Sequence, residues 1–167
     1  MGGRLLTVNL SRDGEGRYLG HNGGETRNVH DQQHQIWRGM ADEGLINDEQ
    51  YRNGTILNFY KSLEEFMAPL KDESSAAYRN GLRLVDERTV YVTCPYRRRW
   101  DKDGDTAAFA AGLMATIRSW SRHSFAGAAG DAAADMVFAR LQQRIAEAPN
   151  EWSLDYVEHH QMMEKVA

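Results

Sequence analysis

The chain has 167 residues, of which 41% are hydrophobic and 26% are charged. Both fractions are close to those of ordinary globular proteins, which argues against a disordered chain and against a membrane-spanning one. The length is typical of one domain, so we expect a single domain over residues 1–167. The formal net charge of −4 argues against binding of nucleic acid over most of the surface, because such proteins are usually basic overall.

Three features of the sequence bear on cellular location. The first residues, M-G-G-R-L-L-T, lack the apolar region of a secretory signal. The longest apolar stretch, residues 107–115, is too short to span a bilayer. One cysteine permits no internal disulfide, in agreement with a reducing compartment. We expect a cytoplasmic protein with no membrane partner.

The first half of the chain predicts two hairpins, one of strands and one of helices. Residues 4–10 alternate as a strand does, and the Asp-Gly pair of S-R-D-G-E-G predicts a turn into a return strand over 17–20. Helical spacing of apolar residues predicts a helix over 29–43, which ends before a glycine. A capping-box pattern opens a second predicted helix over 47–70. The two helices should form a hairpin with an apolar seam.

Residues 82–93 should form the central part of the sheet. The sequence L-R-L-V-D-E-R-T-V-Y-V-T predicts two strands around Asp86 and Glu87. One longer strand with a bulge is the alternative, because Asp-Glu is not a favoured pair in a hairpin turn.

The last third predicts two alanine-rich helices. Asp105 is the expected N-cap of a helix over 106–123. Asp131 is the expected N-cap of a second helix, which ends before Pro149. Beyond Tyr156 we expect a further helix, although W-S-L-D-Y alternates like an edge strand. The predicted fold is α+β, with an N-terminal β-hairpin, a helical hairpin, a central strand pair and a second helix pair on a small, mostly antiparallel sheet.

The densest positive charge lies in C-P-Y-R-R-R-W, residues 94–100. Guanidinium groups donate to phosphate oxygens and aromatic rings stack on bases, so this mixture suits single-stranded nucleic acid. The alternative is that Cys94 is buried and the arginines pair with nearby acids such as Asp101 and Asp103. The predicted contact residues are Tyr96, Arg97, Arg98, Arg99 and Trp100.

A second candidate surface is acidic. Between residues 42 and 73 the chain has eight acidic side chains and three basic ones. This excess predicts a docking face for a basic groove on another protein, and the alternative is an ordinary solvated helix face. The predicted docking residues are Asp48, Glu49, Glu64 and Glu65.

The sequence H-D-Q-Q-H is a candidate metal motif. His30 and His34 are four residues apart at the start of a predicted helix, so their side chains project from one face and can hold one metal ion. Asp31 could act as a base, and E-H-H at residues 158–160 could supply a third ligand. This hypothesis implies a divalent transition metal and a metal-dependent hydrolase.

Other motifs argue against common chemistry. D-K-D-G-D at residues 101–105 lacks the glycine and glutamate positions of an EF-hand, and H-N-G-G-E at residues 21–25 does not have phosphate-loop spacing. The chain has no G-x-S-x-G elbow and no C-x-x-C pair. We therefore expect no cofactor and favour a non-enzymatic protein.

Two short segments suggest a source. T-R-N-V-H-D-Q-Q-H-Q-I-W, residues 26–37, resembles helix starts of some small phage recombination accessory proteins. G-H-N-G-G, residues 20–24, is similar to a stretch in phage-derived proteins. The resemblance implies a phage or mobile-element accessory or inhibitor protein that binds a host machine.

The leading hypothesis is therefore a small cytoplasmic protein that docks on nucleic acid, or on a nucleic-acid-handling protein complex, through residues 96–100. The metal-dependent hydrolase is one alternative. The other is a structural subunit of a larger assembly, with an exposed apolar patch on the alanine-rich helices.

Overall fold

The computed structural model describes residues 3–19 and 27–166, and within them the chain is α+β, as predicted. These residues form two compact units. The sheet unit contains residues 3–19, 59–92 and 155–166, and the helical unit contains residues 27–58 and 93–154. The single domain over residues 1–167 stays a prediction.

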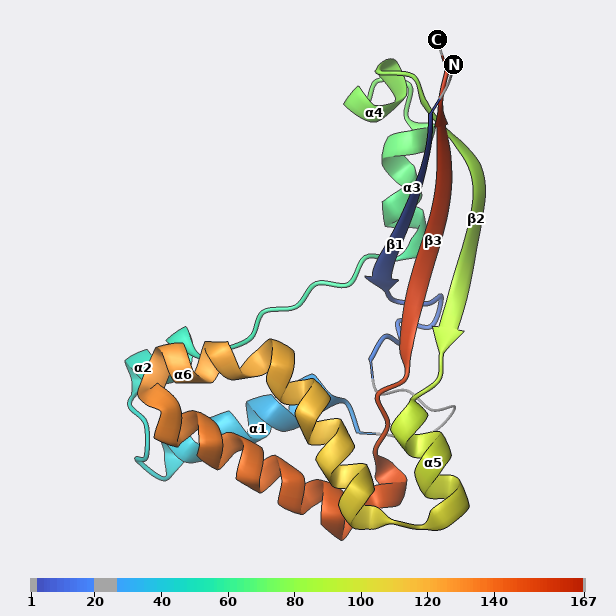
Figure 1. Ribbon diagram of the computed structural model, residues 1–167. Helices are drawn as coiled ribbons and strands as arrows, with labels where there is room; N and C mark the ends of the chain where they lie inside the picture. Colours follow the sequence, from blue (N-terminus) through green and yellow to red (C-terminus); the bar gives the residue numbers. More distant parts are fainter. Residues whose placement is uncertain (1–2, 20–26, 167) are drawn as a thin grey trace. The chain divides into compact units, whose positions relative to one another are not determined.

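The sheet unit is built on three antiparallel strands in the order β1-β3-β2 (Figure 1). The last strand of the chain is therefore the central one, paired on both sides. The strands are β1 (Arg4–Ser11), β2 (Leu82–Val92) and β3 (Tyr156–Lys165).

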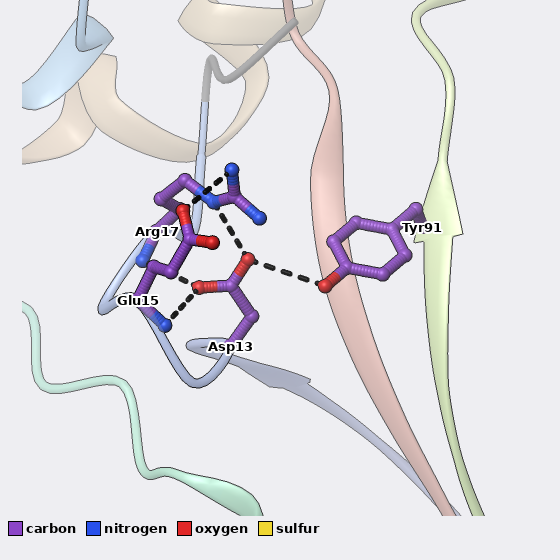
Figure 2. A network of polar contacts seen from close by, with 4 residues as sticks. All are labelled: Asp13, Glu15, Arg17 and Tyr91. Carbon is purple, nitrogen blue, oxygen red and sulfur yellow. Dashed lines mark hydrogen bonds and ion pairs between the residues drawn. The ribbon is translucent and has the colours of Figure 1, made fainter. Parts of the chain in front are cut away.

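The predicted N-terminal hairpin is wrong. β1 pairs with β3, and no described residue of 12–19 belongs to a strand; the remaining predicted position, residue 20, lies outside the described residues. The Asp13 carboxylate accepts hydrogen bonds from the Glu15 amide at 2.9 Å and the Arg17 amide at 3.0 Å. It also accepts from Arg17 Nε at 2.8 Å and from the Tyr91 hydroxyl of β2 at 3.2 Å, as Figure 2 shows. The Asp-Gly turn thus folds around its own carboxylate and does not return as a strand.

We expect Asp13→Asn to destabilise the sheet unit by about 1–3 kcal/mol, because the exchange removes the charge that four donors share. Burial alone would raise the pKa of Asp13, but its bonds with Arg17 and Glu15 lower that pKa below 3.8. The stabilisation should therefore be present above pH 3.8 and be lost as the pH falls further. Urea unfolding measures the change, with Glu15→Gln as control because the Glu15 side chain is 71% exposed. Equal effects of the two variants would contradict this prediction.

β2 is one long strand with a bulge, which was the alternative to a central strand pair. Its register against β3 shifts between Leu84 and Asp86, and Val85 in between is 43% exposed. The bulge is thus at Val85, and Asp86 and Glu87 pair in register with Met162 and Gln161 of β3, so no turn forms there.

The C-terminal segment is a strand, so the prediction of a helix beyond Tyr156 is wrong. Alternate residues of β3 face the core, but two of these four are polar. The apolar residues alone therefore do not show the two-residue period of a strand. The four buried residues are Val157, His159, Gln161 and Met163.

Helix α3 (Leu63–Lys71) packs on this face of the sheet. Phe66 stacks on His159 with ring centroids 5.8 Å apart, and Gln161 donates a hydrogen bond to the Met67 sulfur at 3.2 Å. A short helix, α4 (Ala76–Arg79), follows. Three aliphatic side chains of β1 are at least half exposed: Leu6, Val8 and Leu10. The sequence had suggested an exposed apolar patch on the alanine-rich helices instead.

The helical unit is centred on α6, which contains both predicted alanine-rich helices. Gly130 has φ 84° and ψ 170°, outside helical values, and α6 doubles back there (Figure 1). Ion pairs of 2.8 Å, Arg118 with Asp135 and Arg122 with Asp131, join the two halves. The helices of this unit are α1 (Val29–Asp42), α2 (Asp48–Asn53), α5 (Pro95–Asp103), α6 (Thr106–Glu147) and the 3-10 turn η1 (Pro149–Glu151).

The predicted helix over 47–70 is wrong, and the helical hairpin reduces to α1 and the short α2. α2 ends at Asn53, and its C-cap is Gly54, where a Cβ atom would come within 2.5 Å of the Trp37 ring. The chain then runs outside any helix until Ser62, whose capping box with Glu65 starts α3. The backbone at Gly54 thus lies close against Trp37 in a region that the helical spacing of apolar residues had predicted to be one continuous helix.

No helix in the described residues is long and apolar enough to cross a membrane.

Candidate functional site

The arginine-rich segment forms helix α5. Pro95 occupies the first helical turn, and the Cys94 sulfur caps it by accepting from the Arg97 amide at 3.4 Å. Gly104 ends the helix with φ 67°. Cys94 is only 1% exposed, as its alternative interpretation expected. Consecutive residues of a helix point about 100° apart, so the three arginines face different directions.

Arg97 is part of the structure of the helical unit. Its Nη1 donates to the Asn150 carbonyl at 2.8 Å and the Trp152 carbonyl at 3.4 Å. Its Nε pairs with Asp101 at 2.8 Å, and the side chain is 17% exposed. This guanidinium is not available to a partner.

Arg98 and Arg99 point outward. Arg99 pairs with Asp103 at 3.2 Å, but its side chain remains 73% exposed. Arg98 and Lys102 are exposed and have no ion pair with any residue that the structure describes. The predicted cluster therefore divides into one inward arginine and a small outward group of cations.

A cavity of about 180 Å³ lies between α5 and the start of α6. This is below the roughly 300–1,000 Å³ of sites for drug-sized ligands, so the cavity can hold only a small group. It is lined by Tyr96, Arg99, Trp100, Asp103, Asp105, Ala108, Phe109 and Gly112.

The aromatic walls of the cavity are held in place. The Tyr96 hydroxyl is hydrogen-bonded to the Thr116 hydroxyl at 2.9 Å, and its ring lies so close to Gly112 that a Cβ atom there would be 2.5 Å away. Trp100 Nε1 donates to the Thr106 hydroxyl at 3.1 Å. Because both rings are fixed at their polar ends, the cavity is preformed, which reduces the entropy lost on binding.

Two carboxylates complete the cavity. Asp103 accepts from the Asp105 amide at 3.0 Å and from Arg99, and these contacts hold the pKa of Asp103 below its usual value although desolvation opposes them. Asp105 Oδ1 caps α6 by accepting from the Ala108 amide at 2.9 Å. Its Oδ2 has no partner in the part of the chain that the structure describes. Sequence reasoning missed Asp105, Phe109 and Gly112 as site residues, since they belong to the next helix.

The histidine pair lies on α1 of the helical unit. His30 Nδ1 is hydrogen-bonded to the Asn58 amide at 3.1 Å and His34 Nε2 to the Tyr51 hydroxyl at 3.3 Å. Burial lowers the pKa of His30 below 6.5, and the charge of Asp31 opposes this in part. The pair lines a cavity of about 20 Å³, which is about the space of one water molecule.

The expected third metal ligand is on β3, in the sheet unit. There His159 is fully buried and His160 is 2.8 Å from Glu158. Among the described residues no three His, Cys, Asp or Glu side chains gather to hold a metal ion. The metal site therefore remains a prediction.

The predicted acidic docking residues belong to two helices and two units. Asp48 and Glu49 are in the first turn of α2, and Glu64 and Glu65 are in the first turn of α3. Glu65 accepts from the Ser62 amide and pairs with Arg12 at 3.1 Å. Acids are common in first turns because they favour the positive end of the helix dipole.

No known family model matches this chain, and no curated protein shows significant similarity to it.

Proposed function

We propose that this chain is a binding protein that holds single-stranded nucleic acid at the cavity between α5 and α6. The observation that carries the proposal is the preformed cavity walled by Tyr96, Trp100 and Phe109, with the exposed Arg99 in its lining. Aromatic side chains next to positive charge are typical of sites that stack bases and contact the adjacent phosphates.

The charge of residues 95–105 supports weak binding of nucleic acid at this one place on the surface. Residues 95–105 contain four basic and three acidic side chains, in a chain of net charge −4. Arg98 and Lys102 are the cations of α5 that are free for phosphate, because neither has an ion pair among the described residues. They lie on a different face of the helix from Tyr96 and Trp100, so they would contact phosphates of neighbouring nucleotides. Two phosphate contacts to a single strand predict a slope of log affinity against log salt of about −1.4.

We expect the double variant Arg98→Ala/Lys102→Ala to weaken binding of a labelled single-stranded oligonucleotide and to bring the salt slope from about −1.4 towards zero. Fluorescence anisotropy over a series of salt concentrations measures both quantities. Both side chains are exposed, so the fold should be unaffected.

The matched control is Arg38→Ala/Arg52→Ala, which removes the same charge from two exposed positions of the helical unit. An equal loss of affinity in this control would contradict the proposed surface. A parent chain with no affinity for the strand would contradict the proposed function and would favour docking on a nucleic-acid-handling protein complex.

A further inference from the structure

The free acceptors among the side chains of the α5–α6 cavity belong to its two carboxylates. Trp100 Nε1 already donates to Thr106, and the Tyr96 hydroxyl is engaged with Thr116. The carboxylates of Asp103 and Asp105 offer acceptors only, and Oδ2 of Asp105 has no partner within the described residues. A planar ligand in this cavity should therefore present donors to the Asp105 side.

The remaining donors lie at the mouth of the cavity. Arg99 uses Nε for Asp103, and its side chain is 73% exposed, so its terminal nitrogens are available to a ligand. A guanidinium pairs with two adjacent acceptors in one plane. A fitting ligand should thus have a donor edge for Asp105 and an acceptor edge for Arg99.

Guanine is the nucleobase with this combination. Its N1–H and N2 amino groups are adjacent donors that one carboxylate can accept, and its O6 and N7 are adjacent acceptors that an arginine can contact. Adenine and cytosine place a ring acceptor beside their amino group, and uracil places carbonyl oxygens on both sides of its N–H, so each would set an acceptor against the carboxylate.

We propose that the cavity selects a guanine base, with Asp105 accepting from the N1 and N2 donors and Arg99 contacting O6 and N7. This inference rests on the proposed function and names the base that the site takes. Contact with the aromatic wall, which Tyr96 forms together with Trp100 and Phe109, supplies affinity for any base, and the polar contacts supply the selection.

The test uses three labelled nonamers of uridine whose central residue is guanosine, inosine or adenosine. Inosine lacks the N2 amino group and otherwise has the donor and acceptor groups of guanosine. We expect the guanosine oligomer to bind about tenfold more tightly than the adenosine oligomer, with inosine in between. Anisotropy titrations of the full chain give the three dissociation constants.

The variant Asp105→Asn separates base selection from folding. Asparagine caps helices about as well as aspartate, so the bond to the Ala108 amide is kept while Oδ2 is replaced by a donor. We expect this variant to lose the preference for guanosine and to keep the salt slope of the parent. The control is Asp131→Asn, an acid of α6 that is 78% exposed and lies outside the lining of the cavity.

The outcomes distinguish the two proposals. Binding of all three oligomers with equal affinity would overturn guanine selection and leave the proposed function standing. An unchanged guanosine preference in Asp105→Asn, with native circular dichroism, would show that Asp105 does not select the base. Absence of binding to every oligomer would overturn both.

Discussion

Acidification below about pH 6.5 should destabilise the sheet unit, and the variant His159→Leu should be resistant to this effect. His159 is fully buried on the central strand, against the Phe66 ring, and neither ring nitrogen has a hydrogen-bond partner within the described residues. A charged imidazolium there would lose its hydration, and the Glu87 charge and the Arg88 main chain would offset that loss only in part. The folded state therefore favours the neutral ring.

The direction of the pH effect follows from the pKa of His159. Burial lowers this pKa below 6.5; Glu87 opposes the shift, His160 adds to it, and the nearby main chain of Arg88 opposes it again. Stability from the neutral ring is fully present above the unfolded pKa of 6.5 and is lost as the pH falls towards the folded value. The loss approaches about 1.4 kcal/mol per pH unit.

Urea unfolding monitored by circular dichroism from pH 8 to pH 5 measures this loss. The comparison between parent and His159→Leu isolates His159 from other titrating groups, such as His30 in the helical unit. Leucine also removes two unpartnered polar atoms from the core, so the variant should be at least as stable as the parent at pH 8. His123→Gln, at an exposed position of α6, is the control. Parallel curves for parent and His159→Leu would contradict the prediction.

Two of the three consecutive arginines of α5, Arg97 and Arg98, should respond very differently to alanine. Arg97→Ala should destabilise the helical unit by about 2–3 kcal/mol, because the Asn150 and Trp152 carbonyls lose a charged donor. Arg97 also lies 4.8 Å above the Trp100 ring, so its loss should loosen one wall of the cavity. Arg98→Ala should change stability by no more than about 0.5 kcal/mol, since its side chain is exposed.

Tryptophan fluorescence is a suitable probe for this comparison. All four tryptophans lie in the helical unit, so urea unfolding followed by their emission reports on that unit. Equal midpoints for Arg97→Ala and Arg98→Ala would show that the inward arginine is not structural. The comparison also shows why Arg97 is unsuitable for mapping the binding surface.

Several elements could be predicted because their signals are local. Helix α1 begins at Val29, as predicted, after Asn28 accepts from two backbone amides. Asp105 caps α6, as predicted, and the second alanine-rich helix follows Gly130. The bulge in β2 was the stated alternative to two strands, because Asp-Glu is an unfavourable pair in a hairpin turn. Caps, glycines and turn residues act through neighbours in the chain, so the sequence contains the whole interaction.

The candidate site contains three of the residues that the sequence singled out. Tyr96, Arg99 and Trp100 line the cavity, and their binding role stays a prediction. Arg97 faces inward because carbonyls of residues 150 and 152, about fifty residues later, accept its hydrogen bonds. Asp105 and Gly112 join the cavity only when α6 packs beside α5. No local pattern shows such contacts.

By itself the sequence determined the α+β class, the ends of the capped helices and the presence of cations and aromatic rings in one segment, because these depend on short-range hydrogen bonding and on composition. Only the tertiary structure decided that the last segment is the central strand, with His159 and Gln161 facing the core. It also decided which of three adjacent arginines is exposed. The physical reason is the same in both cases: the burial of a polar side chain depends on what distant segments pack against it, and hydrophobic spacing along the chain does not contain that information.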